Sequence, residues 1–219
     1  NNLWAESLGT NAVKLYNFAG TGAAITVYTR SDKTCCIAPT QLFSNSYGAF
    51  FCYPADWSKG SIYVRDIVGT TTQKALVLGN WGIYTNNGKY YYGRYLSTEI
   101  TLPFDVTYPP AQENGWTGSG TEADPYQVAT VADLFAIADA VNSAEIPEGA
   151  KKVTTFNGVH FKQTKAINLK GYQFTPIGGN DDMYRFGGIY DGDNKTISYL
   201  TVNTGSKGYA ALFGAADTL

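Results

Sequence analysis

Two short groups of carboxylates have residue types and a spacing that could do chemistry. They are residues 191–194 (DGDN) and residues 180–182 (NDD). A calcium ion prefers several carboxylate and carbonyl oxygens as ligands, and a pair of carboxylates can act as acid and base on a glycan. Both groups are also typical of turns, because Asp and Asn tolerate a left-handed φ and bond to their own backbone. We favour turns and keep Asp191 and Asp193 as a hypothetical calcium site.

His160 is the only histidine, and it lies between Val159 and Phe161 in a predicted strand. A hydrolytic triad needs a nucleophile beside its histidine, and the sequence has no Ser or Cys motif of that kind. We therefore expect no catalytic residue, no enzymatic activity and no cofactor other than the hypothetical calcium.

Aromatic side chains are the other candidates for binding. Flat rings can stack on sugars or on a protein partner, whereas in a sandwich alternate members of an aromatic run enter the core or form cross-strand pairs. Such a run occurs at Tyr90, Tyr91 and Tyr92. The candidate binding residues are Trp57, Trp81, Tyr91 and Trp116.

Three cysteines occur in the first quarter of the chain, at Cys35, Cys36 and Cys52. Neighbours in a strand point to opposite faces, so at most one of the adjacent pair could meet Cys52 in a hairpin. One disulfide with one free thiol and three buried thiols are both compatible with this spacing. The pattern lacks the four ligands of a structural zinc site.

The composition excludes several classes of protein. Only 16% of the 219 residues are charged, against about 25% in a typical soluble domain, and 15% are aromatic. The net charge of −2 leaves no basic excess for a phosphate backbone, so nucleic acid is not expected as a partner. No run reaches the ~18 apolar residues of a membrane span, and we expect any membrane anchor to lie upstream of Asn1.

Residues 1–108 are predicted to form an antiparallel β-sandwich domain. Short β-rich runs, such as residues 24–29 and 75–78, alternate with turn formers and show no helical periodicity. The sequence at residues 86–88 (NNG) is a strong hairpin signal, because Asn-Gly accepts positive φ.

A linker is predicted at residues 109–120, because two prolines followed by Gly, Ser and Thr cannot join a sheet ladder for long. The charge changes across it. Residues 1–108 carry +2, from eight basic and six acidic residues, and the chain from Ala111 onward carries −4, from eight basic and twelve acidic residues. This shift supports a domain boundary, with a second domain at residues 121–219.

The second domain begins with a predicted α-helix. Thr130 and Asp133 have the spacing of a capping box, and apolar residues recur at helical spacing up to Asn142. A helix with one apolar stripe must lie on an apolar surface, and here it would cover the end of the strands that follow.

Those strands carry an imperfect repeat. Ile167 is echoed by Leu200 at an offset of 33 residues, and Ile177 by Phe213 at an offset of 36. Stacked β-coils, in which each coil buries its inward apolar residues against the next, have repeats of this length.

The second domain resembles bacterial right-handed β-helix surface proteins. An entry module of those proteins is similar to residues 118–128 (GSGTEADPYQV), 130–142 (TVADLFAIADAVN), 160–169 (HFKQTKAINL) and 174–178 (FTPIG). Their GLUG-type repeat is similar to residues 186–202 (FGGIYDGDNKTISYLTV) and 209–214 (YAALFG), with Ala211 where the repeat usually has glycine. Residues 1–108 resemble only faintly the fimbrillin-like domains of such proteins.

The resemblance implies an all-β chain, with an antiparallel β-sandwich followed by the helix-capped start of a right-handed parallel β-helix that is cut short at residue 219. It also implies a secreted or cell-surface location, often in gut Bacteroidetes, and a role as an adhesin or cell-surface protein. We therefore predict a non-catalytic structural or adhesive module whose partner is a surface glycan or a host or bacterial protein. The alternatives are a carbohydrate-binding module and a fragment of a β-helix polysaccharide lyase or hydrolase.

Overall fold

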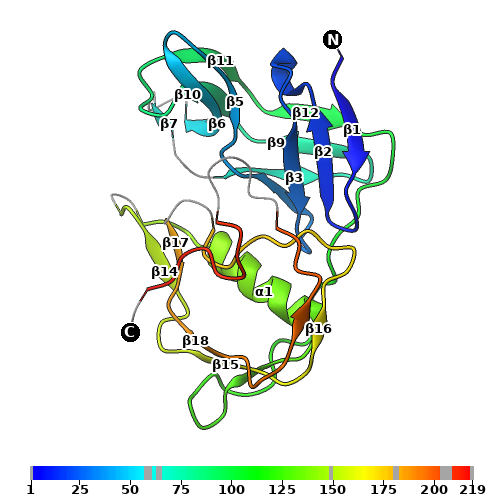
Figure 1. The fold of residues 1–219 in the computed structure, drawn as a ribbon, viewed down its shortest axis with the longest axis vertical. Helices are drawn as coiled ribbons and strands as arrows, with labels where there is room; N and C mark the ends of the chain where they lie inside the picture. Colours follow the sequence, from blue (N-terminus) through cyan, green and yellow to red (C-terminus); the bar gives the residue numbers. More distant parts are fainter. Residues whose placement is uncertain are drawn as a thin grey trace. The chain divides into compact units, whose positions relative to one another are not determined.

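The computed structural model describes residues 2–56, 61–62, 66–147, 150–179, 183–202 and 209–217, with only the backbone of residues 61 and 62. The chain divides into two compact units, of which the first ends at Tyr108 and the second begins at Pro109. Strands dominate both units, and the described residues contain one α-helix (Figure 1). The prediction of a mainly β protein is therefore confirmed.

The first unit contains two antiparallel sheets. The larger has the strand order β1-β2-β3-β4-β8-β9-β12, and the smaller has the order β11-β10-β6-β5, with β7 paired to β6. Strands of the larger sheet are β1 (Trp4–Ser7), β2 (Ala12–Tyr16), β3 (Ile25–Thr29), β4 (Thr34–Ile37), β8 (Ile67–Thr71), β9 (Ala75–Leu78) and β12 (Thr98–Thr101). Those of the smaller are β5 (Gln41–Asn45), β6 (Gly48–Asp56), β7 (Ser61–Ile62), β10 (Trp81–Thr85) and β11 (Tyr91–Tyr95).

Both sheets contribute to one apolar core. Leu15 and Val27 come from the larger sheet, Cys52 and Ile83 come from the smaller sheet, and all four side chains are fully buried. Each lies on a strand whose side chains alternate between the two faces, so one face of each strand enters the core.

The hairpin predicted at residues 86–88 is confirmed. It joins β10 to β11, and Gly88 has the expected positive φ of 68°. The Gly88 amide donates to the Thr85 carbonyl oxygen at 2.8 Å, which closes the turn.

The second unit is built from strands that pair in parallel. β13 (Tyr126–Val128), β15 (His160–Gln163) and β18 (Ile189–Asp191) form one sheet, β14 (Val153–Thr155) pairs with β17 (Tyr184–Phe186), and β16 (Ile167–Asn168) pairs with β19 (Ile197–Ser198). Segments about 30 residues apart in sequence therefore lie side by side.

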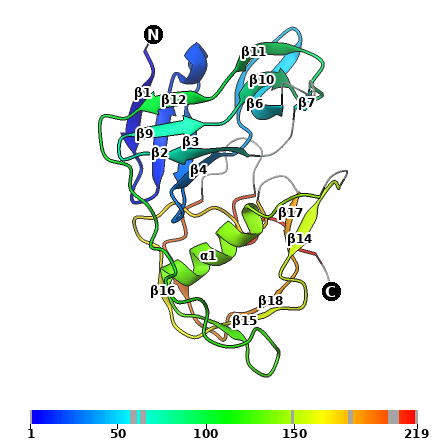
Figure 2. The ribbon, with the colours of Figure 1, turned by 180° about the vertical axis from the view of Figure 1, so that it is seen from behind.

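The helix α1 (Val131–Asn142) lies between the β14–β17 pair and β16 in both views (Figures 1 and 2). It begins with the predicted capping box: the Thr130 hydroxyl accepts from the Asp133 amide at 3.1 Å, and the Asp133 carboxylate accepts from the Thr130 amide at 2.9 Å. Phe135, on the buried face of α1, contacts the Phe174 ring at a centroid distance of 5.4 Å. The apolar stripe of the helix thus packs on the strands that follow it.

One of the two predicted repeat offsets is confirmed, and the other is wrong. Ile177 forms a parallel bridge with Phe213, as expected from the offset of 36. Ile167, however, pairs with Ile197 instead of Leu200, whose side chain is 38% exposed. The turn of residues 192–195 is compact, closed by a 2.7 Å bond from the Lys195 amide to the Gly192 carbonyl oxygen, so the next strand aligns three residues earlier than expected.

Part of the segment predicted as a linker, residues 109–120, packs within the second unit. The Trp116 ring lies 5.6 Å from the rings of both Tyr126 and Phe161. The Gln127 amide donates to the Thr117 carbonyl oxygen at 2.9 Å, and the His160 amide donates to the Gly120 carbonyl oxygen at 2.8 Å. Residues 116–120 thus continue the ladder of the second unit.

Candidate functional site

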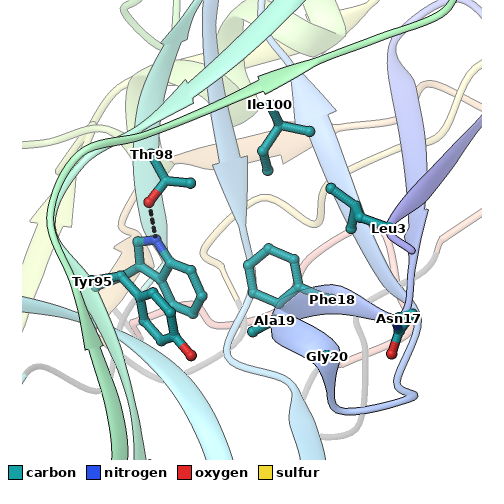
Figure 3. Close-up of a pocket in the computed structure, with 9 residues that line it drawn as sticks. Leu3, Asn17, Phe18, Ala19, Gly20, Tyr95, Thr98 and Ile100 are labelled. Carbon is teal, nitrogen blue, oxygen red and sulfur yellow. Dashed lines mark hydrogen bonds between the residues drawn. The ribbon is translucent and has the colours of Figure 1, made fainter. Parts of the chain in front are cut away.

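An apolar cavity of about 230 Å³ opens on the first unit (Figure 3). It is lined by Leu3, Asn17, Phe18, Ala19, Gly20, Trp81, Tyr95, Thr98 and Ile100. These residues come from β10, β11, β12, the chain before β1 and a short 3-10 turn at Phe18–Gly20. The polar groups among them are few, so the cavity suits apolar side chains or the flat face of a ring.

Trp81 forms the wall of this cavity from within the core. Its ring stacks on Tyr95 at a centroid distance of 4.1 Å and contacts Phe18 at 4.7 Å. Its Nε1 donates to the Thr98 hydroxyl at 3.2 Å, so the indole N–H is satisfied inside the protein. These contacts fix the ring and leave it 2% exposed.

The 3-10 turn that carries Phe18 depends on left-handed backbone at Asn17 (φ 55°) and Ala19 (φ 51°). The Asn17 side chain accepts a hydrogen bond from the Gly22 amide at 2.9 Å, which stabilises this conformation. The turn places Phe18, itself 2% exposed, against Trp81.

A second cavity, of about 390 Å³, adjoins the first. Its lining is Leu3, Trp4, Ala5, Ile100, Thr101, Leu102 and Pro103. Leu3 and Ile100 line both cavities, so the two form one continuous groove between β1 and β12.

The predicted aromatic binding residues have different fates. As exposed platforms, Trp81 and Trp116 are corrected: the first is buried in the core, and the second is half-buried against Tyr126 and Phe161. Tyr91 is 62% exposed, as a ligand-binding ring requires. Trp57 lies outside the described residues.

Four exposed tyrosines form what we call the tyrosine surface: Tyr47, Tyr90, Tyr91 and Tyr92, which are 37% to 62% exposed. The Tyr47 ring, in the turn between β5 and β6, lies 4.9 Å from the Tyr90 ring. The sequence analysis missed Tyr47, although an aromatic residue within a polar turn (SNSYG, residues 44–48) is a signal that could have found it.

Two cations lie over this surface. Lys89 Nζ is 5.4 Å from the centre of the Tyr90 ring, and the Arg94 guanidinium carbon is 4.7 Å from the centre of the Tyr91 ring. The two hairpins that carry the surface, residues 41–55 and 81–95, contain no Asp or Glu. The tyrosine surface therefore combines flat rings with positive charge, a combination that suits an anionic ligand with an apolar face.

The Asp191 and Asp193 carboxylates sit in a tight turn beside two lysines. Asp193 lies 3.2 Å from Lys195 Nζ and 3.7 Å from Lys162 Nζ, and hydrogen bonding by Lys195 lowers the pKa of Asp193. Asp191 accepts from the Asp193 amide at 2.8 Å, as expected for a turn. A calcium ion would have to compete with both ammonium groups, so the geometry supports the turn over the calcium site.

Other candidate residues show no constellation for chemistry. Residues 180–182 lie outside the described part of the chain. His160 is half-buried in β15, where it pairs with Ile189 of β18. Within the part of the chain that the structure describes, no three His, Cys, Asp or Glu residues are grouped so as to hold a metal ion.

Cys35, Cys36 and Cys52 are buried thiols, so the disulfide alternative is not realised. Burial raises the pKa of Cys35 to about 12 and that of Cys52 to about 11. Neither thiol therefore supplies a nucleophilic thiolate near neutral pH.

Among the described residues, no helix is long and apolar enough to cross a membrane. The chain is similar to halomucin of Haloquadratum walsbyi, with 34% identity over 104 residues. The similar region is 47% of this chain and 1% of halomucin, so the chain spans a very small part of that relative. No protein-family model and no solved structure matches the chain.

Proposed function

We propose that this chain is a non-catalytic adhesive region of an extracellular bacterial surface protein. In this proposal the first unit is a β-sandwich that binds a surface glycan through the tyrosine surface. The second unit is the helix-capped start of a right-handed parallel β-helix, which acts as a structural element.

The parallel pairing of the second unit supports the β-helix. Phe161 pairs with Tyr126 on one side and with Tyr190 on the other, so three successive strands are stacked in register. Their side chains continue into one core, in which the Phe186 ring lies 5.9 Å from Phe161 and 5.2 Å from Phe213. Stacking of this kind is the basis of solenoid folds, and the helix α1 covers one end of it.

The observation that carries the binding function is the pairing of exposed rings with cations on the first unit. Exposed tyrosines offer a face to a sugar ring, and Lys89 and Arg94 offer charge to its carboxylate or sulfate groups. Aromatic residues gathered on a surface commonly mark an interaction site. We therefore propose an acidic glycan as the ligand.

An extracellular location is supported by the similarity to halomucin, whose name marks that protein as a mucin. It is also supported by the resemblance of the second unit to bacterial surface proteins with β-helices. Both lines of support concern location more directly than they concern the ligand.

A glycan array probed with the whole chain tests this proposal. We expect saturable binding to uronic-acid or sulfated glycans, weakened about tenfold or more by Tyr91→Ala and by Arg94→Gln. The matched control is Tyr199→Ala, because Tyr199 is a 63% exposed tyrosine of the second unit that also lies under a lysine, Lys170. Binding only to a protein ligand, or binding that all three variants retain, would contradict a glycan site on the tyrosine surface.

The competing hypothesis is a polysaccharide lyase or hydrolase fragment that uses Asp191 and Asp193. Incubation with acidic polysaccharides followed by product chromatography distinguishes the two. We expect no depolymerisation, and cleavage that disappears in the Asp191→Ala and Asp193→Ala variants would overturn the non-catalytic assignment.

A further inference from the structure

The two edges of the larger sheet lie side by side. Figures 1 and 2 both place β1 next to β12, although these are the first and last strands in the sheet order. Six antiparallel pairings separate them, so β1 and β12 run in the same direction. Among the described residues, no strand pairs with the outer edge of either one.

The space between these edges is the continuous groove formed by the two cavities of about 230 and 390 Å³. A water molecule occupies about 30 Å³ in the liquid, so the groove is large enough for several side chains. Its lining from β1 and β12 consists mainly of Leu3, Ala5, Ile100 and Leu102. Ala5, Ile100 and Leu102 also pack against the core of the first unit, so the groove is an unfilled extension of that core.

The groove leaves apolar surface exposed. Leu3 is 41% exposed, although its side chain lines both cavities. An exposed strand edge presents a row of N–H and C=O groups, and proteins usually protect such edges from pairing. Here two edges and an apolar floor face the same space, which is what an added β-strand requires.

The rim of the groove is acidic. Glu6 on β1 and Glu99 on β12 are exposed and alternate with the core-facing residues, so they lie on the outer face of their strands. Glu6 accepts a hydrogen bond from the Tyr16 hydroxyl at 2.7 Å and remains exposed. A strand with basic residues on its outer face would complement both carboxylates.

We propose that the groove between β1 and β12 binds an extended peptide strand of a partner protein. The strand lies antiparallel to both edges, with apolar side chains at alternate positions in the two cavities and basic side chains between them near Glu6 and Glu99. Antiparallel pairing is favoured because its hydrogen bonds are slightly more stable per residue than those of parallel pairing. This surface is separate from the tyrosine surface, so the inference stands whether or not a glycan binds there.

Synthetic peptides of about eight residues test this inference with the whole chain, a length that covers a typical strand. The probes carry Val, Ile, Leu or Phe at alternate positions and Lys or Thr between them. We expect at least one probe to bind and to slow hydrogen exchange of amides in β1 and β12, with no change in β5 or β11. N-methylation of alternate backbone nitrogens should weaken binding about tenfold or more, because it removes donors to the strand edges.

Two matched pairs of variants locate the site. Leu3→Lys should weaken binding of the probe, whereas Leu96→Lys should not, since Leu96 is a 70% exposed leucine that lines neither cavity. Glu99→Lys should weaken binding of Lys-containing probes and strengthen that of probes with Glu in place of Lys. The control for the charge change is Glu113→Lys in the second unit.

Three outcomes would overturn the inference. One is that no probe binds at millimolar concentration, and another is that N-methylated probes bind as well as unmodified ones, which would indicate a general apolar pocket. The third is that the chain dimerises through β1 and β12 and no probe competes, which would make a second copy the occupant.

Discussion

The side chain of Asn142 accepts a hydrogen bond from the Gly178 amide at 3.1 Å, which joins the last residue of α1 to a corner of the second unit. The same side chain donates through Nδ2 to the Pro176 carbonyl oxygen at 2.8 Å. Asn142 is 6% exposed, so both bonds are formed away from water. Gly178 has a φ of 94° and lies so close to the Ala215 backbone that a Cβ there would collide with it. The cap helix and the following corner are thereby held in one arrangement.

Replacing Asn142 with leucine should destabilise the second unit by about 2–4 kcal/mol. The change keeps the volume of the side chain but leaves the Gly178 N–H and the Pro176 C=O buried without a partner, at about 1–3 kcal/mol each. Hydrogen exchange of the α1 amides during urea denaturation measures the loss. Asn114→Ala, at an exposed position of the same unit, is the control, and an equal effect of both variants would contradict a special role for Asn142.

The start of α1 could be predicted from sequence because its signals are local. Thr130 and Asp133 lie three residues apart and satisfy each other's backbone groups, and their spacing alone indicates this. The partners of Asn142 come from a segment 34 to 36 residues later, and no local pattern specifies them. The pairing of Ile167 with Ile197 was mispredicted for the same reason, since the tightness of the intervening turn sets the register.

Trp81 and Trp4 should respond in opposite ways to truncation. Trp81→Ala removes a fully buried ring and should cost the first unit about 3–5 kcal/mol. Trp4 is 55% exposed and stacks on Tyr16 as a cross-strand pair, so Trp4→Ala should cost less than about 1 kcal/mol. Urea denaturation followed by tyrosine and tryptophan fluorescence compares them. A Trp81→Ala chain as stable as the native one would show that the ring is not part of the core.

The aromatic candidates show why site residues were harder to predict than strands. Trp81 and Tyr91 both follow the pattern of a sandwich strand, but the face that each ring occupies depends on a register shift in the β10–β11 pair near Ile83 and Tyr84. That irregularity leaves Tyr91 outside while Tyr95 stacks on Trp81. Alternation alone cannot place a bulge, so it could not separate the buried ring from the exposed one.

The buried thiols predict a loss of stability at alkaline pH. An unfolded thiol has a pKa of about 8.5, whereas burial raises the pKa of Cys52 to about 11 and that of Cys35 to about 12. Below the unfolded pKa both states keep the proton, so the contribution to stability is fully present there. As the pH rises from there toward the folded values, the unfolded chain loses protons first, and each thiol should lower stability by about 1.4 kcal/mol per pH unit.

Urea denaturation between pH 8 and pH 10 measures this slope. The Cys52→Ala variant should lose part of it, corresponding to one proton, and a slope identical to that of the native chain would contradict the assignment. A thiol-reactive reagent at pH 8 should modify Cys35 and Cys52 slowly in the folded chain and rapidly in urea.

Removal of calcium should leave the stability of the chain unchanged. The carboxylates of Asp191 and Asp193 already face Lys162 and Lys195, so a divalent cation has no vacant anionic site at this turn. Thermal melting with a chelator and with millimolar calcium tests the point. A calcium-dependent rise in melting temperature that disappears in Asp193→Asn would restore the metal site.

Asp217 should make the second unit sensitive to acid. Its carboxylate accepts a hydrogen bond from the Thr154 hydroxyl and others from Lys152 Nζ at 3.1 Å and from the Arg185 guanidinium at 2.9 Å. These bonds, that of Thr154 foremost, lower the pKa of Asp217 to about 2.

Because the folded pKa lies below the unfolded value of about 3.9, the stabilisation by Asp217 is present above pH 4 and is lost as the pH falls toward 2. Asp217→Asn should lower the melting temperature of the second unit at pH 7 and should flatten its dependence on pH between 4 and 2. Asp124→Asn, at an exposed carboxylate of the same unit, should leave that dependence unchanged. If the Asp217→Asn chain melts with the native pH dependence, the contacts with Thr154, Lys152 and Arg185 do not stabilise the fold.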